Sequence, residues 1–170
     1  MHDQKISYSP FNTIFNFLVA VGFFILLIIL LIQIHTTAGT IFVLILLAIA
    51  GQGMFTFVKS FVLFTLKQPA IILTQEYFVD NSMGIKIRWT DMNAISVYNF
   101  NGRVFLAFNV TDNSIIFRQV LNPIQNVFLR INAALSKKSF MTNFSVLKGK
   151  SSEIFDVVSN YYQNTAKNQI

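Results

Sequence analysis

The stretch IFNFLVAVGFFILLIILLIQI, from Ile14 to Ile34, decides the architecture of this chain. It is apolar on every face of a helix, and at about 1.5 Å per residue such a helix spans the ~30 Å hydrocarbon layer of a bilayer. A second apolar stretch, IFVLILLAIAGQGMFTFV, runs from Ile41 to Val58. The two stretches predict transmembrane helices at about residues 13–34 and 40–60.

Only the residues 35–40 separate the two apolar stretches, so the helices are expected to form an antiparallel hairpin. Lys5, Lys59 and Lys67 flank the outer ends of this hairpin, whereas no charge marks its turn. Positively charged residues stay on the cytoplasmic side of membrane helices. We therefore expect both termini in the cytoplasm and His35 on the opposite side.

A cleaved secretory signal is the alternative interpretation of the first stretch, because the residues around Thr37 are small and resemble a cleavage site. Signal sequences have a basic start and an apolar core of about 7 to 15 residues. Here the apolar stretch is longer, and a second apolar stretch follows at once. The region before the first stretch is only weakly basic, because it contains Lys5 and His2 together with the acidic Asp3. The sequence therefore favours a retained membrane helix.

The charged residues are distributed unevenly. They make up 12% of the 170 residues, against roughly 25% in an ordinary soluble domain, and none lies between residues 6 and 58. The formal net charge is +6. Beside a bilayer, such a balance favours attraction to anionic headgroups. Nucleic acid is not an expected partner, because no basic run is longer than Lys137-Lys138 and no nucleic-acid-binding motif is present.

The segment 68–170 is expected to form one cytoplasmic domain of the α+β class, which leaves residues 1–67 to the transmembrane hairpin. Its roughly 100 residues are enough for a single hydrophobic core. Short alternating or apolar stretches predict an antiparallel sheet. The predicted strands cover Ala70–Leu73, Tyr77–Val79, Gly84–Trp89, Ala94–Phe100, Arg103–Val110, Ile115–Val120 and Asn143–Leu147.

Asn101-Gly102, between two of these strands, is the strongest short signal for a β-hairpin. A two-residue turn there pairs Phe100 with Arg103 and Tyr98 with Phe105. A second hairpin is expected to turn at Asp112-Asn113. Because side chains alternate along a strand, we expect Ile95, Val97, Leu106 and Phe108 on the core face, and Tyr98, Phe100, Arg103 and Phe105 on the other.

Two helices are expected within the domain. Asn122-Pro123 is a helix start, with Asn as the cap and Pro at the first helical position. Ser151 or Ser152 is expected to cap the final helix. The predicted buried stripes are Ile124, Val127, Phe128, Ile131 and Leu135 in the first helix, and Ile154, Val157, Val158, Tyr161 and Tyr162 in the second.

This order of elements resembles a family of small bacterial inner-membrane proteins in which two transmembrane helices precede a pleckstrin-homology-like (PH-like) domain. Trp89-Thr90-Asp91-Met92, closing a strand, is the most recognisable shared element, although Met92 stands where Ile or Val is more usual. The resemblance implies a curved antiparallel sheet with an inserted helix, closed by a C-terminal helix. It also implies a domain that binds lipid headgroups or protein segments and does not catalyse a reaction. The other matching features are the hairpin itself, Gln68-Pro69-Ala70-Ile71, Ile87-Arg88, Asn122-Pro123 and the Ser-capped final helix.

The sequence offers no compelling catalytic or metal-binding set. The chain has no Cys, and His2 and His35 are expected on opposite sides of the membrane. Gly149-Lys150-Ser151 lies between a predicted strand and a predicted helix, as in phosphate-binding loops, but Phe144 stands where that motif requires its first glycine. We therefore expect a non-enzymatic protein with no catalytic residues, no cofactor and no bound metal.

The best candidate binding surface is the outer face of the predicted sheet. Lys86 and Arg88 alternate with Ile85, Ile87 and Trp89, which are expected in the core. Basic residues interleaved with aromatic residues can hold a headgroup phosphate or an acidic peptide. The alternative is an ordinary solvated sheet face. The candidate residues are Lys86, Arg88, Tyr98, Phe100, Arg103, Phe105 and Arg118.

Two functions from different classes remain open. The first is a membrane-anchored interaction module that binds a protein or a lipid headgroup at the inner leaflet. The second is an immunity protein that neutralises a membrane-targeting bacterial toxin through helix contacts inside the bilayer. An enzyme is the third interpretation. A transport path is disfavoured, because two helices without an intramembrane charge make a poor transporter.

Overall fold

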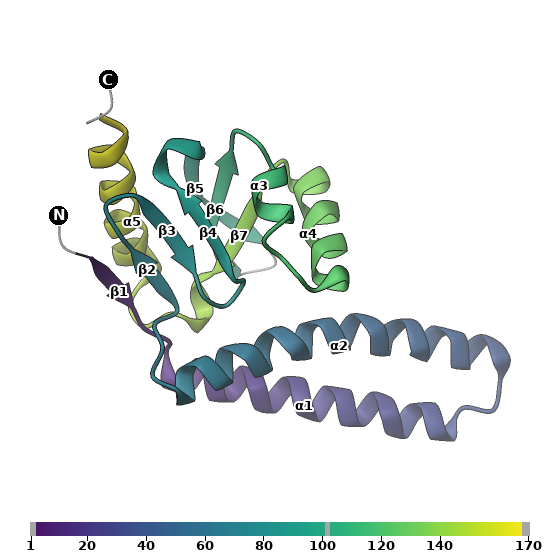
Figure 1. The fold of residues 1–170 in the computed structure, drawn as a ribbon. Coiled ribbons are helices and arrows are strands. Elements are labelled where there is room, and N and C mark those ends of the chain that lie inside the picture. The colour runs from purple at the N-terminus through teal and green to yellow at the C-terminus, as the bar shows by residue number, and fades with distance from the viewer. Residues whose placement is uncertain (1–2, 101–102, 168–170) are drawn as a thin grey trace.

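Two long helices form a hairpin beside an α+β domain in the computed structural model, which describes residues 3–100 and 103–167 (Figure 1). The strands are β1 (Gln4–Ile6), β2 (Ile71–Leu73), β3 (Tyr77–Asp80), β4 (Ile85–Arg88), β5 (Met92–Phe100), β6 (Arg103–Val110) and β7 (Phe140–Asn143). The α-helices are α1 (Pro10–Gln33), α2 (Thr37–Thr65), α3 (Ser114–Phe117), α4 (Pro123–Ser136) and α5 (Ser151–Lys167).

The helices α1 and α2 are each long and apolar enough to cross a membrane. Pro10 occupies the start of α1, where its missing N–H is not needed. The side chain of Thr36 caps α2 by accepting a hydrogen bond from the backbone N–H of Gly39. Leu27 and Val43 are buried between the helices, whereas most of the other large side chains of the hairpin are exposed. The predicted helical hairpin is therefore present.

The first strand precedes the hairpin but belongs to the domain that follows it. Ile6 lies opposite Ile71, and the backbone N–H of Ala70 donates to the carbonyl of Ile6 at 2.8 Å. A few residues later, Tyr8 is buried and forms an antiparallel bridge with Leu147. The predicted boundary at residue 68 thus leaves out one strand of the sheet.

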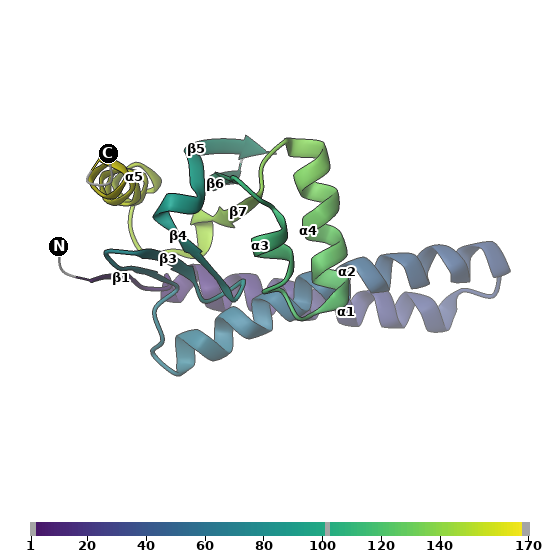
Figure 2. The same cartoon turned by 45° about the horizontal axis from the view of Figure 1, so that its top comes forward.

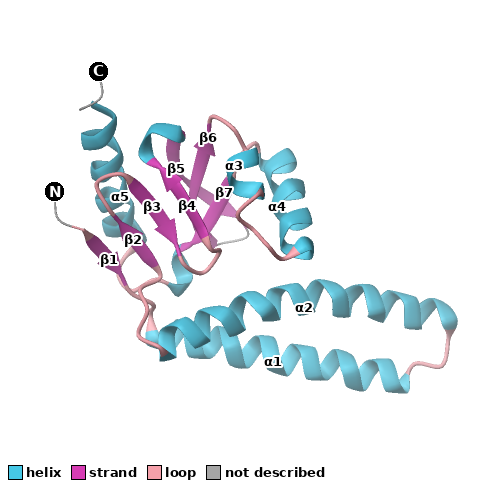
Figure 3. Cartoon of the chain, viewed as in Figure 1, coloured by secondary structure: helices cyan, strands magenta, loops and turns pink. Residues whose placement is uncertain are grey.

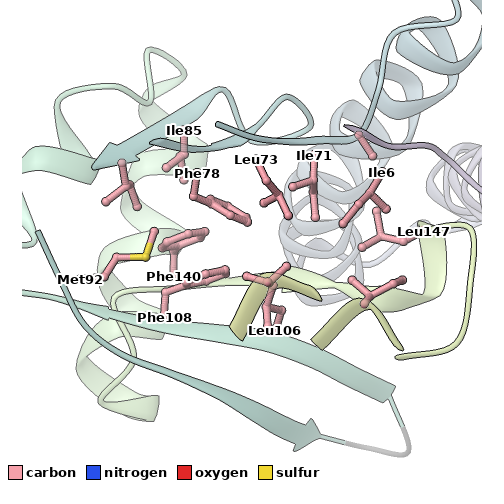
Figure 4. Close-up of a cluster of buried hydrophobic side chains, with 14 of the residues drawn as sticks. Ile6, Ile71, Leu73, Phe78, Ile85, Met92, Leu106, Phe108, Phe140 and Leu147 are labelled. Atoms are coloured by element: carbon pink, nitrogen blue, oxygen red, sulfur yellow. The ribbon is translucent and has the colours of Figure 1, made fainter. Parts of the chain in front are cut away.

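The domain contains two antiparallel sheets that pack face to face (Figure 3). One has the order β1-β2-β3-β4 and the other the order β5-β6-β7. Their facing side chains form one core, which Figure 4 shows between the two layers. The first sheet contributes Ile71, Leu73, Phe78, Ile85 and Ile87, and the second contributes Leu106, Phe108 and Phe140.

The predicted register of the central hairpin is confirmed. In β5 and β6, Phe100 lies opposite Arg103, Tyr98 opposite Phe105, Val97 opposite Leu106 and Ile95 opposite Phe108. The turn residues 101–102 themselves lie outside the described residues. Leu106 and Phe108 are buried as expected, Ile95 packs against the core, and Val97 remains exposed.

The prediction of a strand at Ile115–Val120 is wrong, because this segment begins with the short helix α3. The Asp112 carboxylate accepts hydrogen bonds from the backbone N–H and the hydroxyl of Ser114, which starts a helical turn. After α3, the Gln119 side chain accepts from the N–H of Lys86 at 2.7 Å and donates to the Lys86 carbonyl at 2.8 Å. The side-chain amide of Gln119 thus pairs with the backbone N–H and carbonyl groups at the edge of β4, where a neighbouring strand was expected.

The last predicted strand is also displaced. Phe140–Asn143 forms β7, which pairs with β6, whereas Phe144–Val146 forms a 3₁₀ turn. The Asn143 side chain accepts a hydrogen bond from the N–H of Ser145, which caps this turn. Phe144 and Val146 are still buried, so the apolar residues belong to the core without extending the strand.

The C-terminal helix α5 covers the core as predicted. It begins at Ser151, and Ile154, Val158 and Tyr161 are buried. Trp89 is buried beside Tyr161 and donates its indole N–H to the carbonyl of Thr74 at 2.9 Å. The predicted burial of Trp89 is therefore confirmed.

Helix α4 forms where it was predicted, but its apolar stripe does not face the core. The Asn122 side chain accepts from the N–H of Gln125, as expected of a cap. Gln125 and Leu129 are buried against the domain. In contrast, Ile124, Val127, Ile131 and Leu135 are exposed, and Phe128 is half-buried. The prediction that these residues form a buried stripe is wrong for this chain taken alone.

Candidate interaction surfaces

The structure does not bring the predicted binding residues together on one face. Lys86 and Arg88 lie on β4 in the first sheet, whereas Tyr98, Arg103 and Phe105 lie on β5 and β6 in the second. The core separates the two layers (Figure 4). The single continuous face expected from the sequence is therefore divided, because the strands form two packed sheets instead of one curved sheet.

The first of these surfaces is centred on Tyr77 of β3. Lys86 places its ammonium group 3.9 Å from the centroid of the Tyr77 ring. Arg88 lies on the same face, and its Nε donates to the Tyr77 hydroxyl at 3.3 Å. This hydrogen bond raises the pKa of Arg88 above its ordinary value. We name Tyr77, Lys86 and Arg88 the basic-aromatic cluster; it is cationic, and both basic residues are exposed to solvent.

Tyr98 and Phe105 form part of an apolar groove on the outer face of the second sheet. Met141 of β7 and Leu135 of α4 complete its apolar lining, and Asn132 and Ser136 add polar atoms. The groove has a volume of about 410 Å³. The sequence predicted that Tyr98 and Phe105 share a face, but it did not indicate that α4 forms one wall.

Arg103 lies beside the long hairpin. It lines a cavity of about 210 Å³ together with Asn16 and Ala20 of α1 and Gly53 of α2. The start of β6 therefore reaches the helices where small and polar residues leave room. Phe100 pairs with Arg103 through the backbone, while its side chain lies outside the described part of the chain.

Arg118 is not part of the sheet. It is the residue that ends α3, and its backbone N–H donates to the carbonyl of Ser114 at 3.1 Å. Its predicted place on the outer face of the sheet depended on a second hairpin at Asp112-Asn113, which α3 replaces.

A buried carboxylate joins the two sheets and faces the long hairpin. Asp80 at the end of β3 accepts from the hydroxyl of Thr142 in β7 at 2.6 Å and from the hydroxyl of Ser82 at 2.6 Å. The backbone N–H of Met83 donates to it at 3.0 Å. Lys59 of α2 provides a favourable charge interaction with Asp80. The hydroxyl and N–H donors all belong to the domain and join its two sheets, whereas the hairpin contributes the charge of Lys59 to this cluster.

Among the described residues, the remaining titratable side chains do not form a cluster of the kind that holds a metal ion. Within residues 3–100 and 103–167, no group of three or more His, Cys, Asp or Glu residues is close enough to hold a metal ion. Gly149-Lys150-Ser151 leads into α5, and Lys150 lies 3.9 Å from Glu153 at an exposed position.

Sequence reasoning missed two contributors to these surfaces. The sequence predicts a strand at Tyr77, but the contact of Tyr77 with Lys86 and Arg88 depends on the register of β3 and β4. The apolar residues on the exposed side of α4 have the same helical spacing as a buried stripe. Spacing alone therefore does not show whether that side is buried or exposed. Comparison with protein-family models, curated proteins and solved structures finds no match for this chain.

Proposed function

We propose that this chain is a non-enzymatic interaction module anchored in the bacterial cytoplasmic membrane. The helices α1 and α2 span the bilayer, and the domain and both termini lie on the cytoplasmic side. The observation that carries this proposal is the pairing of β1 with β2. One strand leads into α1 and the other follows α2, so both open ends of the hairpin are fixed to one sheet and the domain lies directly at the membrane surface.

The exposed side chains of the hairpin support its insertion. Phe15, Leu18 and Ile32 of α1 and Phe42 and Ile45 of α2 are each more than half exposed. An apolar surface of this extent is unfavourable in water and suits lipid chains. Loss of the first helix as a cleaved signal would also remove β1 from its sheet.

The distribution of charge supports the orientation. Lys5 in β1, Lys59 in α2 and Lys67 after α2 all lie at the domain end of the hairpin. No Asp, Glu, Lys or Arg lies near its turn at residues 34–36. An excess of Lys and Arg on one side marks that side as cytoplasmic.

The arrangement of the domain supports a PH-like interaction fold. The antiparallel strands, the helix α4 inserted before the last strand and the C-terminal helix over the core support this fold, although α3 replaces one expected strand and β1 precedes the hairpin. The basic-aromatic cluster offers two cations beside one aromatic ring, which suits an anionic group such as a headgroup phosphate or a carboxylate.

Thiol labelling in intact cells tests the membrane topology, because the chain has no Cys of its own. We expect His35→Cys to react with an impermeant reagent in intact cells, and Asn160→Cys, at an exposed position of α5, to react only after permeabilisation. Reaction at residue 160 but not at residue 35 in intact cells would contradict the proposed orientation.

Photocrosslinking in native membranes tests the interaction. A photoreactive residue at Val79, which lies opposite Lys86 in the sheet, should capture a lipid or protein ligand of the basic-aromatic cluster. Changing Lys86 and Arg88 to Gln should abolish the adduct, and a probe at Asn160 serves as the control. An adduct that persists in the double variant would show that the cluster is not the binding site.

A further inference from the structure

Helix α4 has a continuous apolar side that the described part of the domain leaves uncovered. Leu121, just before the helix, and Leu135, near its end, are 93% and 80% exposed. Ile124, Val127 and Ile131 lie between them on the same side, each close to half exposed. The opposite side carries Gln125 and Leu129, which are buried against the domain.

The position of α4 in the fold shows which way its exposed apolar side points. In both views the axis of α4 runs roughly at right angles to the hairpin, its start lies near α2, and it is the part of the domain closest to the hairpin turn (Figures 1 and 2). The buried residues of α4 face the rest of the domain. The exposed apolar side is therefore turned along the hairpin toward its turn, which is the direction of the bilayer if the hairpin spans it.

The depth of α4 agrees with a membrane surface. Phe128 of α4 and Thr56 of α2 line the same cavity, so the two residues lie at one level along the hairpin. From Thr37 to Thr56, α2 rises about 28 Å at 1.5 Å per residue, close to the ~30 Å of a hydrocarbon layer. The first charged residue of α2, Lys59, lies one turn beyond this level.

The charges around α4 suit an anionic surface. Arg130 lies on the helix, and Lys137 and Lys138 follow its end. No Asp or Glu occurs between Asp112 and Glu153. Arg103, beside Ala20 and Gly53 of the hairpin, adds a cation near the same level. Basic residues at this depth are attracted to anionic headgroups.

We propose that α4 is an interfacial helix, which inserts its apolar side into the headgroup and upper acyl region of the cytoplasmic leaflet. The binding partner of this apolar side is a phospholipid bilayer that contains anionic lipid. The apolar surface of α4 continues that of the hairpin, and the two together fix the domain against the membrane at two places. This inference rests on the proposed membrane insertion of α1 and α2.

Depth-dependent fluorescence quenching tests the proposal in the full chain. Single Cys variants at Ile131, Ile45 and the exposed control position Asn160 of α5 carry an environment-sensitive fluorophore. They are reconstituted in vesicles of phosphatidylethanolamine and phosphatidylglycerol in equal parts. Nitroxides are attached either near the headgroup or deep in the acyl chain of added lipids. The fluorescence of Trp89 reports that each variant is folded, and Ile124→Cys replaces Ile131→Cys if the latter does not fold.

We expect the depth of quenching to differ between α4 and the hairpin. The label at residue 131 should shift its emission to shorter wavelengths and be quenched most by the shallow nitroxide. The label at residue 160, on α5 at the end of the domain opposite to α4, should be quenched little by either nitroxide. The label at residue 45 should be quenched most by the deep nitroxide. The shift at residue 131 should be larger than in vesicles of phosphatidylcholine alone.

Three outcomes would overturn the inference in distinguishable ways. A quenched label at residue 45 with a water-exposed label at residue 131 would reject the interfacial helix and leave the anchored hairpin intact. A short-wavelength but unquenched label at residue 131 would show that protein, such as a second copy of the chain, covers α4. An unquenched label at residue 45 would reject the membrane insertion itself.

Discussion

Ile6 lies directly opposite Ile71 in the first sheet, although both long apolar helices separate these residues in the sequence. Both side chains are buried in the same core. The hairpin therefore begins and ends on neighbouring strands, and its two open ends cannot separate without breaking the sheet. This relationship makes the long hairpin and the domain one folding unit in the chain.

Truncating Ile6 should weaken the domain even though it precedes the hairpin. Ile6→Ala removes buried methyl groups, and such substitutions typically cost about 2 to 5 kcal/mol. Unfolding of the full chain in detergent, followed by the fluorescence of its one Trp, measures the loss. Gln4→Ala in the same strand alters an exposed side chain and should change stability by less than about 0.5 kcal/mol. Equal effects of the two substitutions would contradict the role of Ile6 in the core.

The phenol of Tyr8 should make the domain sensitive to alkaline pH. Burial, together with the nearby Asp80 carboxylate, raises the pKa of Tyr8 above its ordinary value of 10.0. The folded state thus holds the neutral phenol, so the stabilisation is complete below pH 10 and declines as the pH rises above it. Tyr8→Phe should flatten the fall in unfolding temperature as the pH rises above about 10. An identical fall in both proteins would show that Tyr8 ionises freely.

The hydrogen bond between Thr142 and Asp80 should contribute measurably to stability. Thr142→Val keeps the shape of the side chain but removes the donor from a buried carboxylate, at a cost of about 1.5 to 3 kcal/mol. Chemical denaturation of the full chain in detergent measures this difference. Thr90→Val, at an exposed position, is the matched control and should be nearly neutral. A neutral Thr142→Val would mean that Asp80 finds another donor.

The single tryptophan should report on the core. Trp89 is buried and packs edge-on against Phe78, with ring centroids 6.0 Å apart. We expect emission at short wavelengths in the folded chain and a shift to longer wavelengths on unfolding. Trp89→Ala should cost about 3 to 5 kcal/mol. A native spectrum like that of free tryptophan in water would be incompatible with the observed packing.

Local signals predicted several elements correctly. The register of β5 and β6 follows from a turn of two residues, because the turn and the alternation of side chains leave little freedom to shift. The start of α4 at Pro123 follows from its cap, Asn122. Each of these signals acts between residues that are close in the sequence.

The errors share a different cause. Ile115 and Ile116 are β-branched and were assigned to a strand, but the Asp112 side chain and the edge of β4 favour a helical turn followed by a side-chain contact. The strand Gln4–Ile6 carries no turn signal, and its partner lies beyond the hairpin. Neither outcome can be inferred without knowing which segments meet in space.

The sequence by itself determined where the two apolar helices lie, because hydropathy along a continuous stretch is a local property that no distant residue alters. It also determined which side chains alternate along each strand. Only the tertiary structure decided which sheet each strand joins, and so it divided Lys86 and Arg88 from Tyr98 and Phe105. It likewise decided that the apolar side of α4 faces outward, because the core was already filled by side chains from both sheets and from α5, and helical spacing specifies a face but not its partner.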